Sequence, residues 1–378
     1  MRSIRNVIFW THLVCGLTAG IIIFIMCVTG ALLAFEKDTI AFAERDNRVV
    51  DAPYEAQTKP VSAIIGAAKQ FRPDSKPSSL LITNDPTAAV MVALGREGQV
   101  FVDPYTGEIK GEGAGGVRSF FRTMTDLHRY IAMSGDGRPV GRAITGAGNL
   151  VFLFLAISGL YIWMPRRLEW RSVRPVLWFR AGTSGKARDF NWHNTIGFWC
   201  SAVLVVLTLT ATVISYQWAS NLVYTLTGNQ PPPPANANAT QAPAQPAETT
   251  ANIDSLWDTA RSQSPTWKTI SLRLPVAKDA VFTIDEGTSW NIFGRSTLTL
   301  DAASGTVAKW EPYSGQNSGR QLRSWMRFTH TGETGGPIGQ FIALVACLGG
   351  AFLVYTGFAL ALRRFGNWRK RKRNAVVV

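Results

Sequence analysis

The fold of this chain is decided where its first long apolar run begins, at Trp10-Thr11-His12-Leu13-Val14-Cys15-Gly16-Leu17-Thr18-Ala19-Gly20. Between Arg5 and Glu36 the chain has no Asp, Glu, Lys or Arg, and this run exceeds the ~20 residues that a spanning helix needs. It nevertheless carries a histidine near its start. On a helix, His12, Gly16 and Gly20 share one face, so an imidazole is followed there by a strip without side chains. Such a face predicts one wall of a site for a planar cofactor.

Three further stretches lack the same four residue types, at 143–165, 193–220 and 334–362. Each is long enough to span a bilayer, so we predict an α-helical membrane protein with a four-helix transmembrane bundle. The first run could also be a secretory signal peptide. It is too long for the apolar part of a signal peptide, and three more runs follow it.

The charges of the segments between the spans predict their orientation. Residues 36–142 hold 14 Lys and Arg against 14 Asp and Glu, and residues 217–336 hold 9 of each. The N-terminus, the loop 166–192 and the tail 363–378 together hold 16 basic and 2 acidic residues. By the positive-inside rule, both termini are expected to be cytoplasmic. The basic tail then indicates an anchor on anionic lipid, and no nucleic-acid partner is expected.

The two halves of the chain match in several separate features, which predicts two parallel two-span repeats. The matching stretches are His12-x-x-x-Gly16 with His193-x-x-x-Gly197, Asp103–Gly107 with Asp301–Gly305, and Gly137–Gly141 with Gly335–Gly339. Each half is expected to carry one small α+β domain outside the membrane.

The pattern predicts helices at 60–70 and 253–262, and strands at 79–83, 88–94, 99–102, 269–274, 280–284, 288–293 and 296–301. The predicted segments are the cytoplasmic N-terminus 1–11, span 12–35, outer domain 36–116, approach segment 117–142, span 143–165, basic cytoplasmic loop 166–192, span 193–220, low-complexity linker 221–251, outer domain 252–318, approach segment 319–336, span 337–362 and basic cytoplasmic tail 363–378.

All four histidines of the chain stand near span ends in repeat-related pairs, His12 with His193 and His128 with His330. A two-fold axis would bring each pair face to face, as axial ligands of a haem iron. Zinc or copper would need a third and a fourth ligand. Histidines also favour membrane interfaces for their polar tips alone. The sequence has no Cys-x-x-Cys-His, so we predict two non-covalent b-type haems and no covalent haem.

Gly16, Gly20 and Gly197 are expected to give the inner haem its flat walls. Anionic haem carboxylates could pair with Arg122, Arg129 and Arg327 at the outer site, or Arg188 at the inner one, although each could equally be an ordinary interfacial arginine. Two such haems would form an electron path across the membrane. No catalytic side chain is expected, because the acceptor would be reduced by outer-sphere transfer at the haem edge.

These features together resemble the PepSY-associated transmembrane proteins. The resemblance rests on the His-x-x-x-Gly span, on Asp103–Glu108, on Leu127-His128 and Thr329–Gly332, and on Ser158–Trp163. It implies PepSY-like outer domains, a bacterial inner-membrane location and a periplasmic ferric-chelate substrate, as in the family's ferric-siderophore reductases. Some relatives add a flavin and nicotinamide domain. We expect no such domain in this chain, so its electrons would come from a cytoplasmic donor or from quinol.

The first hypothesis is therefore a di-haem transmembrane oxidoreductase that reduces ferric iron in a siderophore or similar chelate. Two alternatives stay open. One is a membrane-anchored PepSY module that binds a peptide or protease and holds no haem. The other is a quinol-linked cytochrome b that serves another periplasmic acceptor.

Overall fold

A computed structural model describes residues 2–165, 169–233, 252–287, 291 and 293–376. The chain divides into two compact units. The membrane unit comprises Met1–Glu36, Phe121–Leu222 and Met326–Val378, and the sheet unit comprises Lys37–Phe120 and Val223–Trp325.

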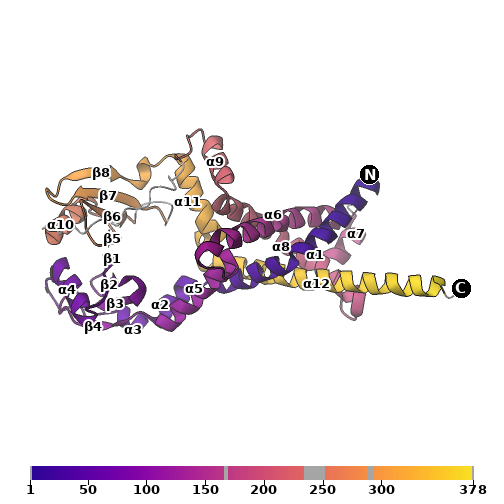
Figure 1. Cartoon of the computed structure of the whole chain (residues 1–378), viewed down its shortest axis with the longest axis horizontal. Coiled ribbons are helices and arrows are strands. Elements are labelled where there is room, and N and C mark those ends of the chain that lie inside the picture. Colours follow the sequence, from indigo (N-terminus) through magenta and orange to yellow (C-terminus); the bar gives the residue numbers. More distant parts are fainter. Residues whose placement is uncertain (1, 166–168, 234–251, 288–290, 292, 377–378) are drawn as a thin grey trace. The chain divides into compact units, whose positions relative to one another are not determined.

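Four long helices build the membrane unit: α1 (Arg2–Leu33), α6 (Arg138–Trp163), α8 (Gly185–Ser215) and α12 (Gly336–Val376). Helices α1 and α8 each pack against both α6 and α12 (Figure 1). All four are long and apolar enough to cross a membrane, where only a helix or a closed barrel satisfies its own backbone groups. Several polar side chains inside the bundle pair across helices. The Asn149 amide, for example, donates to Thr208 O and Thr212 Oγ1, both at 3.0 Å, and so joins α6 to α8.

The helices extend beyond the predicted spans, because an apolar run marks only the part that lipid surrounds. Helix α1 begins at Arg2, α8 begins at Gly185, and α12 continues through the basic tail, whose Arg and Lys residues favour helix. The predicted third span is corrected at its other end. Helix α8 ends at Ser215 and α9 (Gln217–Leu226) follows, so a helix occupies the start of the predicted linker. Linker residues 234–251 lie outside the described residues.

Shorter helices occupy the segments beside the spans. The predicted approach segments contain α5 (Gly115–Tyr130) and α11 (Ser318–His330), and the predicted cytoplasmic loop contains α7 (Trp170–Leu177). Single 3-10 turns lie at Gly95–Glu97, Gly135–Gly137, Tyr313–Gly315 and Glu333–Gly335.

One antiparallel sheet of eight strands forms the sheet unit, in the order β4-β3-β2-β1-β5-β6-β7-β8. The strands are β1 (Ser79–Thr83), β2 (Val90–Ala93), β3 (Gln99–Val102), β4 (Ile109–Glu112), β5 (Thr269–Arg273), β6 (Asp279–Asp285), β7 (Ser296–Asp301) and β8 (Val307–Glu311). The helices before and between them are α2 (Glu36–Ala43), α3 (Arg45–Arg48), α4 (Val61–Phe71) and α10 (Ile253–Gln263). Helices α4 and α10 contact each other, and both contribute to the core that includes Leu80, Leu272 and Phe282.

The expectation of two separate outer domains needs correction. Strand β1 of the first half pairs with β5 of the second, with Leu80 opposite Leu272. Both side chains are fully buried, so the two halves share one core.

Among the predicted strands, those at 79–83, 99–102 and 296–301 are confirmed residue for residue. Strands β4 and β8 were not predicted. The strand expected at 288–293 falls largely on residues outside the described part of the chain.

Candidate functional site

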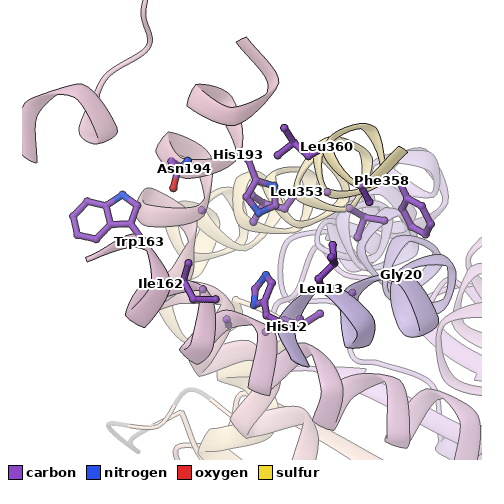
Figure 2. Close-up of a pocket in the computed structure, with 18 of the residues that line it drawn as sticks. His12, Leu13, Gly20, Ile162, Trp163, His193, Asn194, Leu353, Phe358 and Leu360 are labelled. Carbon is purple, nitrogen blue, oxygen red and sulfur yellow. The ribbon is translucent and has the colours of Figure 1, made fainter. Parts of the chain in front are cut away.

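The inner histidines face a cavity of about 390 Å³ inside the membrane unit. Helix α1 contributes His12 and α8 contributes His193, and Figure 2 shows both rings directed into the same space. Apolar side chains of all four long helices make up most of the wall. The volume lies within the range of small-molecule and cofactor sites, roughly 300–1,000 Å³.

The expected glycine strip lies on the wall of this cavity. Gly16, Gly20 and Gly197 all line it, and a Cβ added to Gly20 would lie only 2.5 Å from Phe358 Cε2. Two further glycines lie behind the imidazoles. A Cβ on Gly159 would lie 3.4 Å from His12 Cε1, and one on Gly357 would lie 3.7 Å from His193 Cε1. These glycines therefore let each ring lie close against the neighbouring helix.

Each inner histidine has a hydroxyl partner on the neighbouring helix. His12 Nδ1 lies 2.8 Å from Ser158 Oγ on α6, and His193 Nδ1 lies 2.8 Å from Thr356 Oγ1 on α12. The Thr356 hydroxyl donates to Phe352 O at 3.0 Å, and the Ser158 hydroxyl donates to Leu155 O at 3.4 Å. Because the Thr356 hydroxyl hydrogen is engaged by Phe352 O, its oxygen accepts from Nδ1–H of His193. With the same tautomer at His12, the Ser158 oxygen accepts from Nδ1–H of His12. The Nε2 atom of each ring then keeps its lone pair for a metal.

The outer histidines repeat this arrangement at the other ends of α1 and α8. His128 Nδ1 lies 2.9 Å from Thr29 Oγ1, and His330 Nδ1 lies 2.9 Å from Leu207 O and 3.3 Å from Thr210 Oγ1. A backbone carbonyl can only accept, so His330 also carries its proton on Nδ1. The two rings are neighbours, with their centroids 6.4 Å apart and their planes inclined by 50°.

This donor set fits haem. Within the described residues, no cluster of three or more His, Cys, Asp or Glu could hold a metal ion, whereas tetrahedral zinc needs about four ligands. Two imidazoles with free Nε2 atoms fill the two axial positions of a haem iron, and the porphyrin supplies the remaining four. The inner cavity, lined in part by glycines, provides space beside its histidine pair.

Two basic side chains line the inner cavity, and neither of them is Arg188, which the sequence suggested for this site. Lys186 and Arg364 line it, so their charges are available to anionic groups of a cofactor. Arg188 is instead engaged with buried Asp189, at 3.0 Å, and stacks on Trp192.

The predicted outer arginines are not tied to the histidines by any described contact. Arg129 lies over Tyr130 and Arg327 lies over Phe328. No described contact links Arg122 to a histidine. The expected pairing of all three arginines with haem carboxylates stays a prediction.

Sequence reasoning missed the hydroxyl partners, because each is on a different segment from its histidine. A signal for them was present. Thr29 and Thr210 follow His12 and His193 at the same spacing, and Ser158-Gly159 stands in the same span-end position as Thr356-Gly357.

Four helices suited to a membrane, together with an antiparallel sheet unit, define a multi-pass membrane protein. The chain belongs to the family of the PepSY-associated TM region, which it matches over residues 9–364. The family expected from the sequence motifs is therefore confirmed. No curated protein matches the chain.

Proposed function

We propose that this protein is a di-haem transmembrane oxidoreductase that passes electrons outward to reduce ferric iron in a periplasmic siderophore or similar chelate. The observation that carries the proposal is the pair of matching histidine sites, in which a hydroxyl or carbonyl partner fixes every ring through Nδ1. Haem iron with two imidazole ligands accepts and delivers single electrons.

The chain would consist of two parallel repeats, each supplying one histidine to each pair. From His12 to Thr29, the partner of His128, α1 advances about 25 Å at 1.5 Å per residue. The two pairs are therefore separated by most of the ~30 Å apolar thickness of a bilayer. With both termini in the cytoplasm of a bacterial inner membrane, the His12 pair receives electrons and the His128 pair delivers them. Outward transfer down an outside-positive potential is favourable by ~2.3 kcal/mol per 100 mV.

The ferric-chelate substrate rests on the resemblance to siderophore reductases. The sheet unit offers a polar hollow of about 300 Å³ beside the junction of its halves, lined in part by Asn84, Asp258 and Arg261. Such a hollow suits a polar chelate better than the apolar cavity of the membrane unit does.

The test is a reduced-minus-oxidised absorption spectrum of the purified full-length protein, with its haem-to-protein ratio. We expect b-type bands and two haems per chain, and loss of one haem in His12→Ala or His193→Ala. A colourless protein would overturn the proposal and favour an anchored PepSY module. Reduced protein mixed with a ferric siderophore is expected to be reoxidised as ferrous iron forms. If ferric chelates leave it reduced, another periplasmic acceptor is indicated.

A further inference from the structure

The two opposite edges of the inner cavity differ in chemistry. At the seam between α6 and α8 the lining includes Trp163, Phe198 and Asn194, and at the seam between α12 and α1 it includes the aliphatic residues Ala361, Leu17 and Leu13. The two sets occupy matching positions in the two halves of the chain. Trp163 follows Gly159 at the spacing at which Ala361 follows Gly357. Asn194 and Phe198 follow His193 at the spacings at which Leu13 and Leu17 follow His12. The histidines, their hydroxyls and their glycines agree between the halves, so this difference serves something other than holding the haem iron.

A buried hydrogen-bond donor lies at the α6–α8 edge. The Nε1 atom of Trp163 is shielded from solvent and has no hydrogen-bond partner. An indole N–H can only donate, and such a group costs free energy when it is buried without an acceptor. Asn194 adds polar capacity nearby, since its Nδ2 donates to Phe190 O at 2.7 Å and its Oδ1 can accept. Figure 2 shows Trp163 and Asn194 on the same side of the cavity.

The same edge has a flat aromatic wall. The Trp163 and Phe198 rings stack with centroids 4.5 Å apart and planes inclined by 23°. The outward faces of α6 and α8 at this level expose Tyr161 and Trp199, as lipid-facing helices do. A ligand for this edge is therefore planar, apolar enough to arrive from the bilayer, and equipped with an oxygen that accepts from Trp163.

We propose that this edge binds the ring of a membrane quinol and that the quinol is the electron donor, an inference that rests on the proposed function. The indole N–H of Trp163 donates to one ring oxygen, and Asn194 lies beside the ring. When the quinol is oxidised, both of its O–H bonds break and its two C–O bonds become C=O. The two protons go to water on the cytoplasmic side. The two electrons leave singly through the His12–His193 site and reduce two ferric ions outside.

The test uses the full-length protein in lipid nanodiscs, with decylubiquinone and decylubiquinol as probes. Binding of decylubiquinone is measured calorimetrically in haem-loaded and haem-free samples, and reduction by decylubiquinol is followed at the haem absorption bands. Trp163→Phe keeps the stacked ring and removes the N–H. It is expected to weaken quinone binding about ten-fold, the loss of one buried hydrogen bond. Asn194→Leu, which copies the aliphatic edge, is expected to act in the same direction.

Trp192→Phe is the matched control, because it makes the same chemical change on α8 at a ring that packs on Phe352, away from the cavity. It is expected to bind quinone as the unchanged protein does. The inference is overturned if decylubiquinol does not reduce the haem-loaded protein, or if Trp163→Phe binds quinone normally. If Trp163→Phe loses haem and keeps quinone binding, the N–H serves a haem carboxylate. A protein without haem would refute the proposed function. The quinone-binding measurement on that protein would still show whether the α6–α8 edge binds a quinone.

Discussion

At the scale of single residues, hydroxyl groups decide which nitrogen of each histidine is available. Ser158 and Thr356 each donate to a carbonyl of their own helix and accept from an imidazole of the next one. Partners of this kind fix the tautomer and ring orientation of a metal ligand and raise its basicity. The histidine pairs were predictable from the matching stretches of sequence in the two halves. The hydroxyls were not, because many other Ser and Thr residues stand in the apolar runs.

Replacing these hydroxyls tests their role. In Ser158→Ala and Thr356→Val, we expect the proposed inner haem to bind about 10- to 100-fold more weakly. Its midpoint potential should rise, because a less basic imidazole stabilises ferric iron less. The measurements are haem retention and a redox titration.

The matched control for these variants is Thr18→Val. Among the described residues, the Thr18 hydroxyl bonds only Val14 O and Cys15 O on its own helix. An unchanged potential in Ser158→Ala and Thr356→Val would mean that the hydroxyls only fill space.

At the scale of elements, Glu44 joins α3 and α5 in the sheet unit. Its side chain is fully buried and accepts from Arg118 Nε at 2.5 Å, Arg48 Nη2 at 2.7 Å and the Ala114 N–H at 3.0 Å. Burial raises the pKa of Glu44, and the hydrogen bonds of Arg118, Arg48 and Ala114 more than offset it, so the pKa lies below its usual value near 4.5. Charge spacing in the sequence shows only the pair with Arg48, four residues away. The contacts with Arg118 and Ala114 could not be predicted, because these residues lie far from Glu44 along the chain.

The lowered pKa of Glu44 determines how the stability of the sheet unit changes with pH. Glu44 stabilises the sheet unit above the unfolded-state pKa, and this contribution is lost as the pH falls through the lower folded-state pKa. We expect Glu44→Gln to destabilise the unit by about 1–3 kcal/mol at neutral pH. The variant should also lose less of its remaining stability than the unchanged protein does when the pH is lowered. Hydrogen exchange of residues 37–120 between pH 3 and pH 7 measures both effects.

Glu112→Gln is the control, since its ion pair with Arg72 is half-exposed and such pairs contribute about 0–1 kcal/mol. Parallel pH curves for Glu44→Gln and the unchanged protein would contradict the assignment.

The hydrophobic pattern of the sequence predicted most strands of the sheet unit, but not the two strands at its edges. The edge strands β4 and β8 carry the sequences Ile-Lys-Gly-Glu and Val-Ala-Lys-Trp-Glu. Lysines and acids are depleted in strands generally and suit exposed edges, so no apolar alternation marked these segments. The pairing of β1 with β5 could not be predicted from the sequence either. The sequence of a central antiparallel strand has the same pattern whether the two halves form one sheet or two.

At the scale of the whole molecule, the arrangement of the histidines predicts how the proposed haem sites depend on the two halves of the chain. His12 and His193 face one cavity, and His128 and His330 are neighbours, so each site takes one ligand from each half. If axial ligation requires both members of a pair, removing two histidines has an effect that depends on which two are removed. His12→Ala combined with His193→Ala costs only the inner haem, and the chain keeps one. His12→Ala combined with His128→Ala removes a ligand from each site within a single half, and the chain keeps none. The haem-to-protein ratio of the two double variants separates this pairing from ligation within each half, which predicts the opposite order.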